Sequence, residues 1–245
     1  SVNAFTKFFY QFTEELVMLN DNWLVFKNDI LLSNALAQEI LEIAEESIKL
    51  KGNFTIVLAG GNSPMKLYKI LRNSKSNWDK WSVYIGDERC LPMSDNDRND
   101  QAIMKIWLDH SSIKKHNIHP IKAELGMLAA QLDYENTLDK IDRFDVVLLS
   151  VGEDGHTASL FPNHQYSKNR SVILEYNSPK DPAERISMSP DRLSKARYVF
   201  KIIIGEAKKI AVDLWLKGVP LPINQINGDI EKMYICTNAM PKDSR

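Results

Sequence analysis

The sequence has little cysteine, no excess of one sign of charge and no long hydrophobic run. Cys90 and Cys236 are the only cysteines among 245 residues, so a disulfide framework is excluded. No cysteine–histidine spacing typical of a zinc site occurs either. We therefore expect two reduced thiols in a reducing compartment. The formal net charge is −1 with both signs spread along the chain, which excludes the basic footprint of a protein that binds nucleic acid or a membrane surface.

Targeting and membrane-spanning patterns are also missing from the sequence. No apolar run approaches the ~20 residues that a membrane-crossing helix needs. Glu14 and Glu15 interrupt the aromatic start of the chain, unlike the basic start and apolar core of a signal peptide. We expect a cytoplasmic protein without nucleic-acid or membrane partners.

The remaining composition is that of a globular protein, with 44% hydrophobic and 26% charged residues. Because no repeat or Gly/Ser/Pro-rich linker divides the chain, we expect one domain over residues 1–245. Strand and helix patterns alternate along it. The predicted strands are 54–58, 81–85, 144–151, 171–176, 185–189, 198–204 and 233–236. The predicted helices are 33–51, 97–108, 125–140 and 206–217, with one opened by Ser63-Pro64 and a short one after Ser189-Pro190. This alternation predicts an α/β fold with a mostly parallel sheet and helices on both faces.

Three strands of the predicted sheet end in unusual loops. Their sequences are AGGNSP at 59–64, GDERCLP at 86–92 and VGEDGHTASLFP at 151–162. Ligands of open α/β sheets bind beyond the carboxyl ends of the strands. If the strands are parallel, the three loops share that edge, so we expect them to converge on one site.

The first loop has the features of a phosphate-binding turn. Gly60 and Gly61 allow close approach of the backbone to a ligand, and the following helix offers free N–H groups. Asn62 and Ser63 add polar side chains, with Ser63 as the expected helix cap. The alternative is a tight turn and a cap without a ligand.

The second loop places Asp87, Glu88 and Arg89 directly after an apolar strand. Burying such charges is costly unless they pair or meet a ligand. Two interpretations stay open, namely an Asp87–Arg89 ion pair and an Arg89 that faces an anionic group or a developing oxyanion.

The third loop is the most specific of the three. Gly152 and Gly155 permit a sharp turn, and Asp154 and His156 lie two residues apart, on the same side of an extended segment. An imidazole titrates near pH ~6.5 and can accept a proton from water at neutral pH. A buried structural histidine is the alternative. The other histidines are expected on the solvated surface: His110, His116, His119 and His164.

Taken together, the loops resemble those of the 6-phosphogluconolactonase family. The family pattern combines a GGSTP-like turn, a WxxxxGDER strand end and a GxGxDGHxASLFP loop. This sequence has LAGGNSPMKLY, WSVYIGDERCLP and LLSVGEDGHTASLFP, followed by the similar segment AERISMSPDRLSKARYVFKIIIGEAKK. The resemblance covers about residues 30–237. It implies a Rossmann-like, mostly parallel sheet with a smaller α/β lobe.

The resemblance also implies an activity, the hydrolysis of 6-phospho-D-glucono-1,5-lactone to 6-phospho-D-gluconate in the oxidative pentose phosphate pathway. No metal or organic cofactor is implied. His156 would be the general base, Asp154 would orient it, and Arg89, held by Asp87, would stabilise the alkoxide. Cys90 is expected to pack without a chemical role. The expected phosphate-binding residues are Gly60, Gly61, Asn62, Ser63, Arg185 and Lys208. For Arg185, a salt bridge at the rim remains the alternative.

The sequence departs from the family pattern at four places. Asn62-Ser63 replaces Ser-Thr, and Arg98-Asn99 replaces Ser-Asn. The segment 163–172 is shorter and more polar than usual, and Thr237-Asn238 lacks the common aspartate. The histidine, aspartate and arginine of the expected site are all retained.

Two other functions fit parts of the pattern. Glucosamine-6-phosphate deaminases also have a DGH loop, but theirs continues into a segment with an additional acid, which residues 157–162 lack. A non-catalytic sugar-phosphate sensor is the second alternative, although binding alone would not require both His156 and Arg89. We expect a small sugar-phosphate lactone as the partner, and a monomer or weak homodimer as the assembly.

Overall fold

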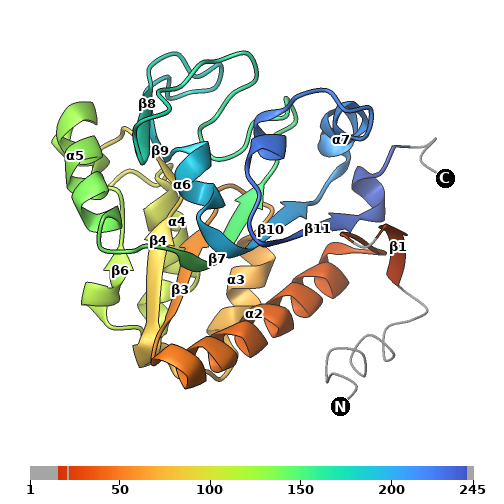
Figure 1. Ribbon diagram of the computed structural model, residues 1–245, viewed down its shortest axis with the longest axis horizontal. Helices are drawn as coiled ribbons and strands as arrows, with labels where there is room; N and C mark the ends of the chain where they lie inside the picture. The colour runs from red at the N-terminus through yellow and green to blue at the C-terminus, as the bar shows by residue number, and fades with distance from the viewer. Residues whose placement is uncertain (1–15, 21, 242–245) are drawn as a thin grey trace.

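A computed structural model describes residues 16–20 and 22–241 of the chain (Figure 1). The expected absence of a signal peptide concerns residues 1–15, which lie outside the described residues. At the centre is an eight-stranded sheet in the order β1-β2-β11-β10-β7-β3-β4-β6, in which only the β1–β2 pair is antiparallel. Its strands are β1 (Leu16–Asn20), β2 (Trp23–Phe26), β3 (Phe54–Leu58), β4 (Trp81–Ile85), β6 (Ile118–His119), β7 (Phe144–Ser150), β10 (Ala196–Ile203) and β11 (Ile230–Cys236).

Helices cover both faces of this sheet (Figure 1). One face packs against α2 (Asp29–Lys51), α3 (Met65–Arg72) and α4 (Asn99–Ile106), and the other against α5 (Met127–Leu138), α6 (Pro190–Ser194) and α7 (Lys209–Leu216). Short 3-10 helices are η1 (Trp78–Lys80), η2 (Leu108–His110), η3 (Lys115–Asn117), η4 (Ala123–Leu125), η5 (Glu206–Lys208), η6 (Pro222–Gln225) and η7 (Thr237–Ala239). In β7, Val146 and Leu148 belong to the core on the side of α2, α3 and α4, whereas Val147 and Leu149 belong to the core on the side of α5, α6 and α7. Burial on both faces explains the unbroken apolar run of this strand.

A second, three-stranded antiparallel sheet lies beyond the ends of the main strands. It consists of β5 (Asp87–Arg89), β9 (Arg185–Met188) and β8 (Val172–Glu175), in that order. This sheet and α5 form the smaller α/β lobe that the resemblance implied. Asp87–Arg89 was expected to be a loop, but it pairs with Arg185–Ser187 from a distant part of the sequence.

The order of the strands creates a switch point between β3 and β7. From β3 the chain continues outward through β4 and β6, whereas β7 lies on the other side of β3 and leads to β10 and β11. Ligands of open α/β sheets bind at such a point, beyond the carboxyl ends of the strands. The loops after Leu58 and Ser150 therefore flank the place where a ligand is expected.

The predicted mostly parallel sheet with helices on both faces is confirmed, but several details were wrong. Helix α2 begins at Asp29, where the Asn28 side chain accepts a hydrogen bond from Leu31 N (2.9 Å). Ser63 does not cap α3, which begins at Met65 without a side-chain cap. His164 is not simply solvated, because its Nδ1 lies 2.7 Å from a carboxylate oxygen of Glu175.

Both thiols are unpaired, as the cysteine count led us to expect. Cys90 and Cys236 are free. Within the described part of the chain, no helix combines the length and the apolar character that crossing a bilayer requires. The prediction of one domain stays a prediction.

Candidate active site

The three loops do converge, on a cavity of about 120 Å³ at the carboxyl ends of β3, β4 and β7. The end of β3 contributes Leu58 and Ala59, and the end of β7 contributes Leu148 to Ser150. Nine of the ten predicted site residues line this cavity: Gly60, Gly61, Asn62, Ser63, Asp87, Arg89, His156, Arg185 and Lys208. The tenth, Asp154, contacts His156 directly behind the cavity wall.

His156 and Asp154 form the titratable pair of the site. Asp154 Oδ1 accepts hydrogen bonds from His156 Nδ1 and from the His156 backbone N–H (3.1 Å). Partial burial opposes ionisation of Asp154, but the hydrogen bonds and charge of His156 outweigh it and lower the pKa of Asp154 well below its usual range. Because an ionised carboxylate can only accept, His156 Nδ1 is the donor of this bond, and in the neutral imidazole Nε2 then carries the lone pair. The His156 side chain is 18% exposed, so this lone pair can serve a molecule in the cavity.

A tight turn holds this pair, and Gly152 makes room for it. Gly152 N donates to His156 O (2.7 Å) and Gly155 N donates to Gly152 O (3.1 Å). A Cβ atom on Gly152 would lie 2.1 Å from His156 Nδ1 and 2.7 Å from Asp154 Oδ1. Gly155 has a φ of +87°, a conformation that favours glycine. Both glycines of the motif are therefore explained by the geometry of the dyad.

The glycine turn after β3 offers unpaired N–H groups to the cavity. In the described residues, no acceptor bonds the amides of Gly61, Asn62 or Ser63. Gly61 has a φ of +80°, which turns the backbone before α3. A Cβ on Gly60 would lie 2.1 Å from Asn99 Oδ1, so Gly60 admits the Asn99 side chain. Free amides ahead of a helix N-terminus are a ready donor site for an anion.

Arg89 and Asp87 both line the cavity. Among the described residues, however, they do not form the ion pair that was expected between them. The interpretation that Asp87 holds Arg89 was therefore wrong. Asp87 Oδ2 instead accepts the hydroxyl hydrogen bond of Ser159 (2.7 Å), which ties β5 to the loop that carries His156. Arg89 Nη1 donates to the carbonyl of Asp97 (2.5 Å). Its buried Nε has no partner among the described residues. An unsatisfied guanidinium donor at a cavity is typical of a group that meets a ligand.

Glu88 does not face the cavity but fixes the start of α4. Its buried carboxylate accepts hydrogen bonds from the backbone N–H groups of Arg89 (2.8 Å), Asn99 (2.7 Å) and Asp100 (2.9 Å). Burial and the charge of Asp100 raise the pKa of Glu88 to about 8, although the three N–H donors oppose this. The sequence did not indicate a role for Glu88, because the N–H groups that it binds lie up to 12 residues away along the chain.

Two further cations, Arg185 and Lys208, line the cavity. Arg185 lies over the Phe161 ring and uses Nε and Nη2 to hold the carbonyls of residues 180–182, so the rim salt bridge considered for it does not form within the described residues. Lys208 is the last residue of η5, and its ammonium makes no hydrogen bond or ion pair with any described residue. Burial lowers the pKa of Lys208, and the charge of Lys180 adds to this. An unpartnered, half-buried ammonium favours an anionic ligand.

Three further residues belong to the site without having been predicted as part of it. The Phe161 ring packs 4.9 Å from the His156 imidazole and also supports Arg185. Ser159 binds Asp87, as described above. Asn99 Nδ2 donates to the Asp87 carbonyl (2.8 Å), and Asn99 lines the cavity. The sequence signal for Phe161 and Ser159 was their place within the motif loop; for Asn99 it was the match to the family pattern.

Cys90 follows Arg89 in the chain but does not line the cavity, and its lack of a chemical role stays a prediction. Its Sγ contacts Met127 Sδ (3.0 Å), and burial raises the pKa of this thiol to about 11. No group of three or more His, Cys, Asp or Glu side chains in the described ranges is arranged to hold a metal ion. The absence of a cofactor requirement stays a prediction.

Fold and site define an α/β protein whose cavity combines a histidine–aspartate pair with unpaired backbone N–H groups and cationic side chains. The model of the family "Glucosamine-6-phosphate isomerases/6-phosphogluconolactonase" matches residues 27–235. The 6-phosphogluconolactonase of Mycobacterium leprae is 31% identical over 212 residues, which are 80% of this chain and 86% of that protein. Among solved structures, Thermotoga maritima 6-phosphogluconolactonase superposes with a TM-score of 0.83 at 24% identity, over 88% of this chain and 99% of that one. A monomeric glucosamine-6-phosphate deaminase has the same fold, with a TM-score of 0.77 at 18% identity over 89% of this chain and 98% of that one. The chain belongs to the glucosamine-6-phosphate isomerase/6-phosphogluconolactonase family.

Proposed function

We propose that this protein hydrolyses 6-phospho-D-glucono-1,5-lactone to 6-phospho-D-gluconate. The observation that supports this most strongly is the placement of the His156–Asp154 pair in one cavity with the unpartnered cation of Lys208. A base that activates water and a separate anion-binding group are the two requirements for hydrolysing a phosphorylated lactone.

His156 begins the reaction as the general base. Asp154 holds Nδ1 as the donor, so Nε2 accepts a proton from a water molecule in the cavity. The hydroxide adds to C1 of the lactone and forms a tetrahedral alkoxide. When the bond between C1 and the ring oxygen breaks, protonated His156 returns its proton to that oxygen. The product is the open-chain acid, and no covalent intermediate with the protein is needed.

Arg89 stabilises the charge that develops on the C1 oxygen. Its Nε lacks a partner among the described residues, while Nη1 is anchored on the Asp97 carbonyl. An oriented donor that meets an oxyanion contributes about 3–4 kcal/mol to the transition state. Asp87 contributes indirectly, because it binds Ser159 and thereby fixes the loop that carries His156.

The phosphate binds to the cavity groups that have no partner among the described residues. The free amides of Gly61, Asn62 and Ser63 and the ammonium of Lys208 are its ligands, with the side chains of Asn62 and Ser63 available for further hydrogen bonds. Arg185 keeps Nη1 free of bonds to the described residues, so it can add one more donor. Gly60 takes part by admitting Asn99 beside the turn.

The test is proton release from freshly prepared lactone 6-phosphate at slightly acidic pH, where spontaneous hydrolysis is slow. We expect the protein to accelerate this release and to liberate no ammonia from glucosamine 6-phosphate. Ammonia release without lactone hydrolysis would assign the deaminase activity instead. Binding of the phosphosugar without either reaction would indicate a sensor. A cytoplasmic place in the oxidative pentose phosphate pathway is part of the same proposal.

A further inference from the structure

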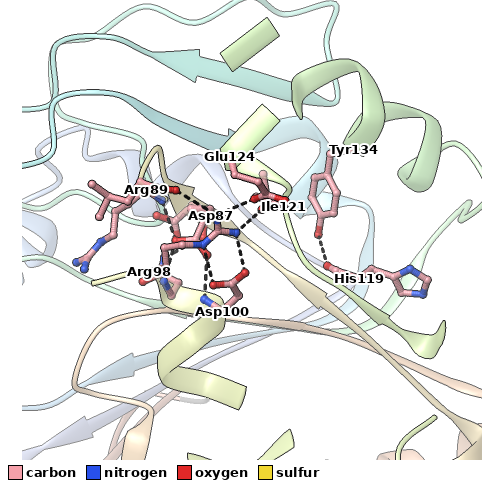
Figure 2. Close-up of polar contacts among 11 residues, drawn as sticks. Asp87, Arg89, Arg98, Asp100, His119, Ile121, Glu124 and Tyr134 are labelled. Atoms are coloured by element: carbon pink, nitrogen blue, oxygen red, sulfur yellow. Dashed lines mark hydrogen bonds and ion pairs between the residues drawn. The ribbon is translucent and has the colours of Figure 1, made fainter. Parts of the chain in front are cut away.

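Arg98 is a buried cation that the mechanism above does not use. Its side chain is only 1% exposed, yet it makes five hydrogen bonds. Nε and Nη2 bind both carboxylate oxygens of Asp100 (3.0 and 2.7 Å), and Nη1 binds Glu124 (2.7 Å). The carbonyls of Leu91 and Ile121 accept the remaining two bonds (3.2 and 3.0 Å). Figure 2 shows the guanidinium enclosed by Asp100, Glu124 and Ile121.

These bonds join three separate parts of the chain. Leu91 follows β5, Asp100 lies in the first turn of α4, and Ile121 and Glu124 belong to the segment between β6 and α5. Each N–H group of a guanidinium points in a fixed direction, so one arginine can hold all three segments at defined angles. A lysine ammonium, with three rotatable donors, cannot reproduce this pattern.

The segment that Arg98 anchors carries one residue that lines the cavity and one that holds a cavity residue. Asp97, the residue before it, supplies the carbonyl that holds Arg89 Nη1 at 2.5 Å. Asn99, the residue after it, lines the cavity and packs against Gly60. Arg98 itself does not line the cavity. Its position between Asp97 and Asn99 means that any shift of the 97–99 backbone moves the anchor of Arg89.

Glu88 also fixes this region, but it does not bind the Asp97 carbonyl. Glu88 fixes only the amides of Arg89, Asn99 and Asp100, so it sets the first turn of α4 but not the carbonyl of Asp97. The amide of Arg98 makes one longer bond, to the Asp95 carbonyl (3.3 Å). The amide of Asp97 donates to Asp95 Oδ1 (2.9 Å), so the turn at 95–98 has local bonds of its own. The guanidinium of Arg98 ties this turn to Leu91, to α4 and to the 121–124 segment, and thereby fixes where the Asp97 carbonyl lies relative to β5.

We propose that Arg98 is a positioning residue for Arg89, which it keeps aimed at the developing oxyanion by fixing the Asp97 carbonyl. This inference rests on the proposed function, because the oxyanion belongs to lactone hydrolysis. Arg98 touches neither substrate nor product.

The experiment compares Arg98→Lys with a matched control, Arg192→Lys. Arg192 is also buried, stacks on Phe144 and holds the carbonyl of Ile141 (2.7 Å), but it does not line the cavity. Both variants are expected to lower Tm. Well below Tm, Arg98→Lys lowers kcat by about 10- to 100-fold with KM changed less than about threefold, whereas Arg192→Lys leaves kcat within about twofold.

A double-mutant cycle separates positioning from general destabilisation. In an Arg89→Ala background, adding Arg98→Lys should change kcat by less than about twofold, because the group that Arg98 positions has been removed. Independent, multiplicative losses in the double variant would overturn the proposal, as would wild-type kcat in Arg98→Lys. If Arg98→Lys does not fold, Glu124→Ala removes only one of the five bonds and is expected to reduce kcat by a smaller factor in the same cycle.

Failure of the proposed function would be recognised separately, as absence of lactone turnover in the wild type. The positioning claim is then decided by crystal structures of the wild type and Arg98→Lys. Loss of the Arg89–Asp97 bond only in the variant supports it, and an unchanged bond refutes it.

Discussion

Gly152→Ala is a sharp perturbation of the proposed mechanism, because it adds one methyl group and removes no functional group. The new Cβ would lie 2.1 Å from His156 Nδ1 and 2.2 Å from His156 Cε1. Non-bonded heavy atoms prefer separations of about 3.5–4 Å, so the imidazole has to move by more than about 1 Å. A displacement of that size at a reacting group can cost about 10²-fold in rate. We therefore expect kcat to fall about 100-fold while the fold persists, since the partly exposed ring can swing toward the cavity.

The assay is lactone hydrolysis together with thermal unfolding, and Gly126→Ala is the control. Gly126 has a φ of +85°, lies away from the cavity and has no neighbouring atom within 4 Å of the position that a Cβ would take. Gly126 also has a ψ of 159°, a combination that only glycine adopts readily, so alanine there costs about 1–3 kcal/mol without touching the site. Gly126→Ala should lower Tm and keep kcat. Wild-type kcat in Gly152→Ala would refute the assignment of His156 as the base held by Asp154.

Three other predictions concern the anion site, the dyad and a buried acid. Lys208→Met should raise KM at least about tenfold, with kcat within about threefold. Lys209→Met, which loses only an exposed pair with Glu206, should leave KM and kcat unchanged. Equal effects of the two substitutions on KM would contradict the phosphate assignment. Asp154→Asn should lower kcat by about 10²-fold or more, because Nδ1 of His156 is no longer held as the donor; unchanged kcat would remove the orienting role. The pKa of Glu88 is raised to about 8, so its contribution to stability is complete below the unfolded value of about 4.3 and is lost as the pH rises through 8. Urea unfolding should therefore show a fall in stability between about pH 5 and 8 that Glu88→Gln removes, and parallel curves for the two proteins would contradict this.

The sequence predicted those features that depend on local pattern. The apolar run at 144–151 indicated a strand buried on both faces, and alternating helices implied parallel neighbours, which together brought the three loops to one edge. The pairing of Asp154 with His156 was expected from their spacing of two in an extended segment, but it forms in a tight turn instead. These are short-range relations, so they can be recognised without knowledge of the fold.

The missed features depend on partners that are distant in sequence. Asp87 binds Ser159, 72 residues away, instead of Arg89. Strand β5 has only three residues and exists because β9 pairs with it. The spare donor of Arg89 and the unpartnered ammonium of Lys208 likewise become visible only when all neighbours are in place. Such choices between competing partners are made by the tertiary structure.

The central claim is that the imidazole of His156 takes the proton of the attacking water. The most direct test is kcat for lactone 6-phosphate hydrolysis by His156→Ala and wild type, with near-UV circular dichroism to verify the fold. The account predicts a loss of about 10²-fold or more with an unchanged spectrum. Equal turnover by the two folded proteins would contradict it.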